Sequence, residues 1–150
     1  MKLALASDHA GYPLKQHLVN YLREQGHEIV DLGVDTDAVP VDYTDAAKKV
    51  GQAVVDGTAE RGILVCGSGV GASIAANKMK GVYSAITHDA YSAAQGVEHD
   101  NMNVMALGSR IIGVALAEKL ADAFIGAKFL TDPDRYMRRF KQVQEMEDNS

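Results

Sequence analysis

The 150-residue sequence contains no tryptophan, three prolines and a single cysteine, Cys66. One cysteine cannot form an intramolecular disulfide, and Cys66 lies among apolar residues and glycines, so we expect a reducing, cytoplasmic location. No apolar run approaches the roughly 18 residues that a membrane-spanning helix needs. Charged residues also return too soon after the N-terminus for a secretory signal, so the sequence predicts no association with a membrane.

Positive charge is scarce as well, because 15 Lys and Arg against 20 Asp and Glu give a net charge of −5. A nucleic-acid-binding protein needs a basic face, so we expect no nucleic-acid partner. An apolar share of 47% and a charged share of 23% are typical of a globular chain, and the length fits one domain. A few local arginines are enough to bind one phosphate group, so the acidic average still permits a phosphate site.

Short apolar runs alternate with longer segments of helical periodicity along the chain. The runs that predict buried strands are 3–6, 27–32, 62–65, 82–87 and 104–107. The segments that predict helices are 13–26, 43–55, 72–80, 90–98, 115–125 and about 135–147. This alternation predicts one α/β domain over residues 1–150, a Rossmann-like doubly wound fold with a five-stranded parallel sheet and helices on both faces.

In such a fold, ligands bind beyond the carboxyl ends of the strands. Asp8 and His9 follow the first predicted strand, the segment 66–71 follows the third, and Arg110 follows the fifth. We therefore expect a binding site at this edge of the sheet. Three other histidines are predicted to be ordinary surface residues on loops: His17, His27 and His88.

Three glycines at alternate positions occur in the segment 67–71, Gly-Ser-Gly-Val-Gly. Such a segment can turn tightly before a helix and direct several backbone N–H groups toward a phosphate or an oxyanion. It matches neither the dinucleotide-binding nor the Walker pattern, and its serine is misplaced for the nucleophile elbow of hydrolases. An ordinary strand-to-helix turn is an equally good interpretation of these residues.

Candidate proton carriers surround this segment in the sequence. Cys66 directly precedes it, and a helix N-terminus stabilises a thiolate, although a lone cysteine is more often a small core residue. The pair Asp8 and His9, and His99 before the fifth strand, are suited to proton transfer near neutral pH. One cysteine with scattered histidines lacks the spacing of a zinc site, so we expect no metal.

The last predicted helix carries two arginines four residues apart, Arg135 and Arg139. Their guanidinium groups share one helical face and can bind one phosphate together. A solvated charged helix is the simpler interpretation of the same pattern. Arg110 is better placed for a phosphate, because it follows a strand at the predicted binding edge.

Taken in order, several segments resemble the type B ribose-5-phosphate isomerases and the related galactose-6-phosphate isomerases: Ser7-Asp8-His9-Ala10-Gly11, Asp42-Tyr43, the stretch 62–71, the stretch 73–78, His99-Asp100-Asn101 and Gly108-Ser109-Arg110. The resemblance runs through nearly the whole chain. It implies an aldose–ketose isomerase that acts on a sugar phosphate without a cofactor or a metal. It also implies a homodimer or a dimer of dimers in which each active site is shared between two subunits.

The resemblance further implies a role for each candidate residue. Cys66 would remove the C2 proton of the open-chain sugar and Ser68 would move protons between O1 and O2. His99, with Asp8 nearby, would open the furanose ring. Backbone N–H groups for the enediolate would come from Gly67, Gly69, Val70 and Gly71. The residues that would contact the rest of the substrate are His9, Tyr43, Asp100, Arg110, Arg135 and Arg139.

The sequence departs from the family pattern in two places. Asp100 stands where the family commonly has Asn, and the segment 131–136 replaces a Gly-Gly-Arg-His stretch with two extra residues, which puts Tyr136 in place of the His. Arg138 therefore competes with the two arginines named above for the phosphate. The last helix is expected to complete the phosphate site or a dimer contact.

These departures leave the substrate open. Ribose 5-phosphate is the first expectation, and erythrose 4-phosphate, allose 6-phosphate or galactose 6-phosphate would undergo the same chemistry. A phosphate- or nucleotide-binding module without catalysis is the alternative of a different class. A redox-sensing cysteine protein is a weaker alternative, because the sequence has no second cysteine to resolve an oxidised thiol.

Overall fold

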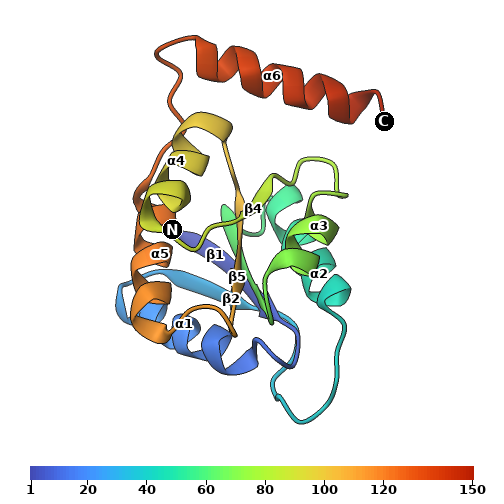
Figure 1. Ribbon diagram of the computed structural model, residues 1–150, viewed down its shortest axis with the longest axis vertical. Helices are drawn as coiled ribbons and strands as arrows, with labels where there is room; N and C mark the ends of the chain where they lie inside the picture. The colour runs from blue at the N-terminus through green and yellow to red at the C-terminus, as the bar shows by residue number, and fades with distance from the viewer.

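Strands and helices alternate along the computed structural model, which describes residues 1–150 (Figure 1). The strands are β1 (Lys2–Ser7), β2 (Glu28–Asp31), β3 (Arg61–Cys66), β4 (Ser84–Ile86) and β5 (Val104–Gly108). The helices are α1 (Tyr12–Glu24), α2 (Tyr43–Val55), α3 (Val70–Ala76), α4 (Ala90–Asp100), α5 (Val114–Gly126) and α6 (Arg135–Asp148). The predicted order of elements is confirmed.

All five strands are parallel and lie in the order β2-β1-β3-β5-β4. The chain winds from β1 outward to β2 and then crosses to the other side of β1 to form β3. The winding therefore reverses between β1 and β3, and in open parallel sheets this reversal creates a crevice beyond the carboxyl ends of the two strands. The predicted parallel sheet is confirmed, and it directs attention to the residues that follow β1 and β3.

Alternate side chains of the strands face two separate hydrophobic clusters. Leu3 and Leu5 of β1 pack with α1, α4 and α5, whereas Ala4 and Ala6 pack with α2 and α3. Small residues on the second face let α2 approach closely: a Cβ on Gly62 of β3 would lie 2.3 Å from an α2 side chain. Helices cover both faces of the sheet, as predicted from the sequence.

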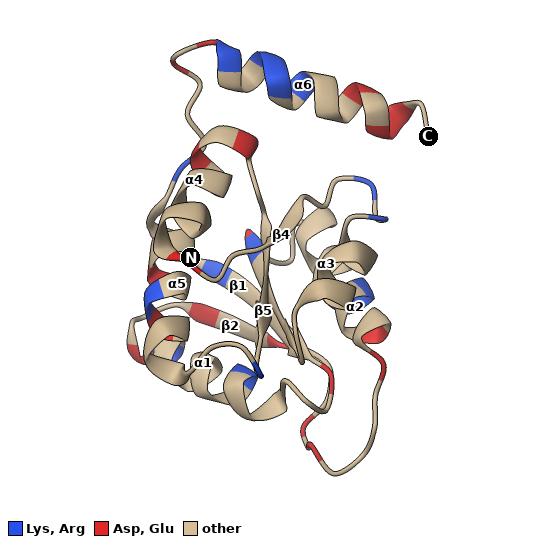
Figure 2. Ribbon diagram, in the orientation of Figure 1, with Lys and Arg blue, Asp and Glu red and all other residues tan.

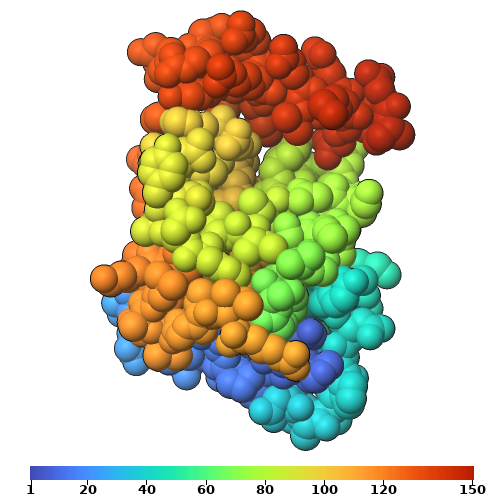
Figure 3. Space-filling view, viewed as in Figure 1, coloured from blue at the N-terminus to red at the C-terminus, as the bar shows by residue number.

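Helix α6 covers neither face. It lies across one end of the molecule, next to the C-terminal end of α4 (Figures 1 and 3). Its buried side chains are Tyr136 and Phe140, and the Phe140 ring packs edge-on against Tyr83 and Phe129 with centroid separations of 5.0 and 5.5 Å. Figure 2 shows basic residues in its N-terminal half and acidic residues in its C-terminal half, an order that the helix dipole disfavours.

Two predicted boundaries are wrong. The helix predicted over 72–80 is α3, which ends at Ala76 because the side chain of Asn77 bonds both the N–H and the carbonyl of Ser84 at 2.8 Å and so fixes a turn. The strand predicted over 82–87 is the shorter β4, which lies at the edge of the sheet and pairs on one side only. None of the helices combines the length and the apolar character that crossing a membrane requires.

Candidate active site

Half of the predicted site residues line one hollow at the carboxyl ends of β1, β3 and β5. Its volume is about 310 Å³, within the size range of small-molecule sites. The residues around it, which we call the thiol half-site, are Asp8, Tyr43, Cys66, Gly67, Ser68, Gly71, Arg110 and Ile111. All of them except Ile111 are residues that the sequence predicted, although they are distributed over about a hundred positions of the chain.

Cys66 is the last residue of β3, and it is both a core residue and a site residue. Its side chain packs among the small residues under α2 and α3 and is 4% exposed, while its sulfur borders the hollow. The Gly69 N–H donates to the Cys66 Sγ at 3.2 Å. Gly69 has φ +85°, and a Cβ there would lie 3.1 Å from the Leu107 carbonyl carbon, so this turn requires glycine. The two interpretations of Cys66 in the sequence are therefore compatible.

The glycine-rich segment forms the floor of the hollow. Ser68 is exposed, and its Oγ accepts the Val70 N–H at 3.3 Å. The first-turn N–H groups of α3 have no acceptor within the helix, and the N-cap residue is a glycine. The Tyr43 ring lies over Gly71, where a Cβ would approach it to 2.6 Å. Backbone N–H groups thus gather at the floor of the hollow beside an exposed aromatic ring, a composition suited to an anion or an oxyanion. Two of them are bonded within the segment, that of Gly69 to the Cys66 Sγ and that of Val70 to the Ser68 Oγ.

Arg110 is held beside this floor by its own backbone. Its N–H donates to the Gly67 carbonyl at 3.0 Å, and the preceding Ser109 N–H donates to the Cys66 carbonyl at 2.8 Å. The Arg110 side chain is exposed and takes part in none of the ion pairs of the structure. A positive charge without an ion-pair partner therefore lies at the rim of the hollow.

Asp8 and His9 follow β1 but serve different parts of the site. The Asp8 side chain is 8% exposed, lines the hollow and accepts the Gly11 N–H at 2.9 Å. His9 does not line the hollow; its Nδ1 lies 3.1 Å from the Val41 nitrogen and 3.2 Å from the Val41 carbonyl oxygen, and this contact fastens the loop between β2 and α2. A role of His9 in substrate binding stays a prediction.

The remaining candidates lie at the opposite edge of the sheet: His99, Asp100, Arg135 and Arg139. Helix α4 returns from the carboxyl edge and ends just before β5 begins, so its last residues lie at the amino ends of the strands. Figure 1 shows the end of α4 and α6 at the top of the view, and the loop that follows β2 at the bottom. Within one chain Asp8 and His99 therefore lie at opposite ends of the strands, and their predicted proximity stays a prediction for a site shared between two subunits.

Five residues at the end of α4 and the start of α6 make up what we call the imidazole half-site: His99, Asp100, Arg135, Tyr136 and Arg139. The His99 ring stacks on Tyr136 with a centroid separation of 4.0 Å and an interplanar angle of 14°. Arg135 donates to the Tyr136 hydroxyl at 3.1 Å. The Gln95 amide nitrogen lies 2.9 Å from the His99 Nδ1 and donates to it, so a neutral His99 carries its proton on Nε2.

Tyr136 is a residue whose role the sequence did not reveal. In the sequence it is only a replacement for the family's His, whereas in the structure its ring stacks on that of His99. Nothing in the sequence brings residue 136 next to residue 99, because their contact depends on where α6 packs. Arg138 and Arg139 are both exposed, and a role of Arg139 beside Arg135 stays a prediction.

The three histidines predicted to be surface residues have different surroundings. His17 lies on α1 rather than on a loop and pairs with Glu118 at 2.7 Å, and the His27 Nδ1 lies 3.3 Å from the N-terminal amine. His88 does not fit the prediction: it is half-buried, and its Nε2 accepts the Gly108 N–H at 2.9 Å at the end of β5. Because His88 comes just after β4 in the sequence, its place at the carboxyl ends of the strands could have been predicted.

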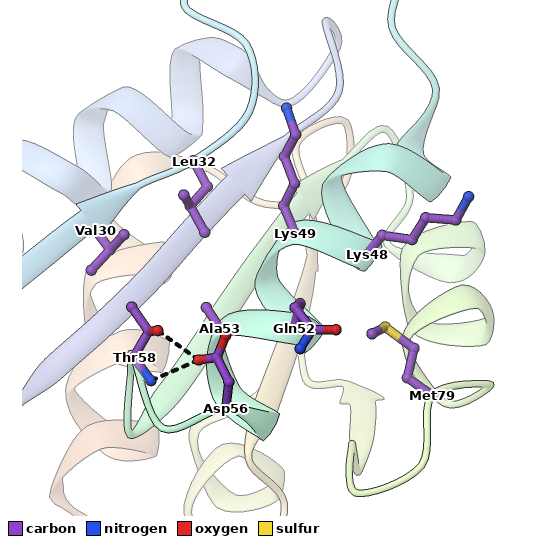
Figure 4. A pocket seen from close by; sticks show the side chains of 9 residues that line it. All are labelled: Val30, Leu32, Lys48, Lys49, Gln52, Ala53, Asp56, Thr58 and Met79. Atoms are coloured by element: carbon purple, nitrogen blue, oxygen red, sulfur yellow. Dashed lines mark hydrogen bonds between the residues drawn. The ribbon is translucent and has the colours of Figure 1, made fainter.

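A larger hollow of about 580 Å³ lies between β2 and α2 (Figure 4). Its lining is mainly apolar side chains and the stems of Lys48 and Lys49, and the Asp56 carboxylate there is bonded to Thr58. This hollow holds no thiol or imidazole, so we do not assign the candidate site to it. Nowhere in the structure do three or more His, Cys, Asp or Glu side chains gather as a metal-binding group.

Comparison with known proteins agrees with the geometry. Residues 3–143 match the family described as Ribose/Galactose Isomerase. The chain is 38% identical over 146 residues to the ribose-5-phosphate isomerase B of Escherichia coli, covering 97% of this chain and 96% of that protein. It is 37% identical over 129 residues to the D-erythrulose-4-phosphate isomerase of Pectobacterium atrosepticum, covering 86% and 85%. The structure of Clostridium thermocellum ribose-5-phosphate isomerase B superimposes with a TM-score of 0.95 at 38% identity, covering 99% of each chain.

Proposed function

Because the chain belongs to the ribose/galactose isomerase family of sugar phosphate isomerases, we propose that it interconverts ribose 5-phosphate and ribulose 5-phosphate through a cis-enediolate. The observation that carries this proposal is the composition of the thiol half-site. A thiol, a buried carboxylate, a hydroxyl and an unpaired guanidinium surround one small hollow at the carboxyl edge, contributed by Cys66, Asp8, Ser68 and Arg110.

Isomerisation moves one proton between adjacent carbons. The Cys66 thiolate removes the proton from C2 of the open-chain aldose, and the electron pair forms the C1–C2 double bond of the enediolate. The Cys66 thiol then returns a proton to C1, which gives the ketose. One base serves both carbons because they are neighbours on one face of a planar intermediate. Ser68, at the mouth of the same hollow, transfers protons between O1 and O2.

A base alone is not enough, because the C2 proton of a sugar is only weakly acidic. The backbone N–H groups of the segment from Gly67 to Gly71 act on the negative charge that develops on the enediolate oxygens. Removal of one such donor from another enzyme costs about 2.7–4 kcal/mol of transition-state stabilisation. The positive charge of Arg110 at the rim adds to this field and attracts an anionic substrate.

One chain does not hold a complete site, since the imidazole half-site lies at the other edge of its sheet. In the proposed homodimer, or dimer of dimers, a second copy sets its imidazole half-site across the hollow. His99 of the second copy, together with Asp8, then moves the protons that furanose ring opening requires. Arg135 and Arg139 of the second copy bind the phosphate, remote from the reacting carbons, and so position them.

The substrate is tested by incubation with aldose phosphates of four, five and six carbons in deuterated water. We expect deuterium at C2 of recovered ribose 5-phosphate, with faster turnover than for erythrose 4-phosphate, allose 6-phosphate or galactose 6-phosphate. Asp100, in place of the family's Asn, is the residue that would change this order. Activity should be unaffected by EDTA, since no metal takes part in the proposed steps.

The role of Cys66 is tested in the same assay. The variant Cys66→Ala should lose both deuterium exchange and turnover, whereas Arg23→Met, at the exposed end of α1, should retain both. Unchanged turnover in Cys66→Ala would remove Cys66 from the role of base. Tight binding of sugar phosphates by the unaltered protein without any exchange would favour a binding module instead of an enzyme.

A further inference from the structure

The edge strand β4 ends before its hydrogen-bond ladder with β5 is complete. The last backbone bond of the ladder runs from the Thr87 N–H to the Ala106 carbonyl, at 3.4 Å. In a regular parallel ladder the Thr87 carbonyl would accept the next N–H of β5, which is that of Gly108. The Gly108 N–H is bonded instead to the His88 Nε2, at 2.9 Å. An imidazole therefore takes the place of a backbone carbonyl at the carboxyl edge of the sheet.

Gly108 is in direct contact with the floor of the thiol half-site. A Cβ on Gly108 would lie 2.6 Å from the Ser68 carbonyl oxygen, so the two backbones touch. The two residues that follow Gly108 donate their N–H groups to the carbonyls of Cys66 and Gly67, at 2.8 and 3.0 Å. A shift of Gly108 would therefore shift the thiol, the hydroxyl and the backbone donors together.

The contact requires one protonation state of the ring. The His88 Nε2 can accept a hydrogen bond only when it carries no proton, so the neutral ring is protonated on Nδ1. Burial lowers the pKa of His88, and no charged side chain contributes to that shift. The neighbouring carboxylate, that of Asp89, is already bonded to the Ser92 N–H at 2.7 Å as the N-cap of α4. The surroundings thus favour the neutral, accepting form.

We propose that His88 is a positioning residue of the active site, which anchors Gly108 and thereby fixes the turn against which the segment from Ser68 to Gly71 is packed. The inference rests on the proposed function for its catalytic consequence, and on the contact of His88 with Gly108 for its structural part. It deepens the proposed function, because it explains how backbone donors stay in place at an edge where the outermost strand has already ended.

The kinetic test compares two substitutions of His88. His88→Leu removes the acceptor, and we expect kcat to fall about 10- to 100-fold, the range produced by small misplacements of catalytic groups. KM should stay within about twofold, because donors to the enediolate act after the substrate has bound. In His88→Gln the side-chain oxygen reaches the position of Nε2 and should restore most of kcat. His17→Leu, on α1, is the control and should not alter either constant.

The structural test follows the Gly108 amide by NMR hydrogen exchange. The Gly108 amide should be protected against exchange in the unaltered protein and in His88→Gln, and this protection should be lost in His88→Leu. Full kcat and full Gly108 protection in His88→Leu would overturn the proposal. Loss of kcat in both variants, with protection kept in His88→Gln, would also overturn it, since the ring itself would then be needed.

Two further outcomes are separable. Should His88→Leu not fold, acidification of the unaltered protein through the pKa of His88 must release the Gly108 amide, and His88→Gln must lack this step in amide protection; its absence from the unaltered protein would overturn the proposal. Protection of Gly108 together with no turnover of any sugar phosphate would refute the proposed function and still support the anchoring of Gly108 by His88.

Discussion

The two half-sites differ in what holds them. The thiol half-site follows directly from buried strands, and its residues are fixed by backbone hydrogen bonds that continue the sheet, such as those from residues 109 and 110 to the carbonyls of Cys66 and Gly67. The imidazole half-site rests on the ends of two helices, and its visible contacts are between side chains: His99 on Tyr136, and Arg135 on the Tyr136 hydroxyl. One half is part of the fold, and the other depends on how α6 packs.

This difference gives a reason for an assembly. In this structure one chain holds its two half-sites at opposite ends of the strands and does not bring them together. Two copies related by a two-fold axis can complete two sites at once, because a symmetric interface repeats every contact. The exposed position of α6, outside both layers of the sheet, leaves its basic N-terminal half free to face a second copy (Figure 2).

The largest expected effect is the recovery of activity when two inactive variants are mixed. Cys66→Ala damages the thiol half-site and His99→Asn damages the imidazole half-site, so each homodimer should be nearly inactive. After subunit exchange, random pairing makes half of the dimers mixed, and each mixed dimer holds one intact site, so about a quarter of the original activity should return. The measurement is turnover of ribose 5-phosphate before and after the exchange.

The matched control for this experiment is a mixture of Cys66→Ala with a second thiol half-site variant, Ser68→Ala. If Ser68→Ala alone is impaired, mixing should restore nothing, because the two defects lie in the same half. Equal recovery in both mixtures, or recovery in neither, would contradict the assignment of His99 to the second copy. Full activity of a monomer in sedimentation would do the same.

The thiol half-site could be predicted from the sequence because each of its parts is local. Asp8 directly follows a buried strand, Cys66 ends another, and strand ends in a parallel sheet meet at one edge. The sheet and its two helical layers followed from the alternation of apolar runs in the same way. Prediction of the thiol half-site required only the order of the strands and helices, and hydrophobic periodicity supplies that order.

The contacts of the imidazole half-site could not be predicted because they are not local. His99 precedes β5 rather than following a strand, so the order of elements places it at the amino ends of the strands, but that order does not give its partners. The stacking of Tyr136 on His99 depends on the packing of α6, which no apolar period specifies. His88 was missed for another reason: its bond replaces a backbone contact, and the sequence does not show where β4 leaves the sheet.

The second prediction concerns the connection between the two regions. Arg61 begins β3, the strand that ends at Cys66, and its guanidinium donates to the carbonyls of Phe124 and Ala127 at the end of α5, at 2.5 and 2.7 Å. Arg61→Met leaves these half-buried carbonyls without a charged donor. We expect the free energy of unfolding, measured in urea, to fall by about 2–4 kcal/mol.

Arg61→Lys keeps the charge but not the forked geometry, so it should lose less than Arg61→Met. Arg23→Met, at the exposed end of α1, is the control and should change stability little. Equal stability of Arg61→Met and the unaltered protein would mean that water satisfies the end of α5. The hydrogen bonds from Arg61 of β3 to the end of α5 would then contribute nothing to the position of the imidazole half-site.

The smallest expected effect is an alkaline weakening of the contact that holds α6. The Glu147 carboxylate of α6 accepts the Tyr83 hydroxyl at 2.9 Å and the Gly81 N–H at 2.8 Å. Burial and this bond to Glu147 raise the pKa of Tyr83 above its ordinary value. The pKa of Tyr83 is higher in the folded protein than in the unfolded chain. Its contact with Glu147 therefore contributes fully to the free energy of unfolding below a pH of about 10, and this contribution is lost as the pH rises through the pKa of the folded protein.

The unaltered protein should therefore be more stable than Tyr83→Phe near neutral pH, and the difference in urea midpoint should vanish at alkaline pH. Tyr21→Phe is the control, because Tyr21 donates to Asp122 between α1 and α5, far from α6 in sequence, and its pKa is raised to about 12. Alkaline loss of activity that disappears in Tyr83→Phe but not in Tyr21→Phe would show that the imidazole half-site needs α6 in this place. If both variants still lose activity at alkaline pH, the deprotonation that causes this loss belongs to another group.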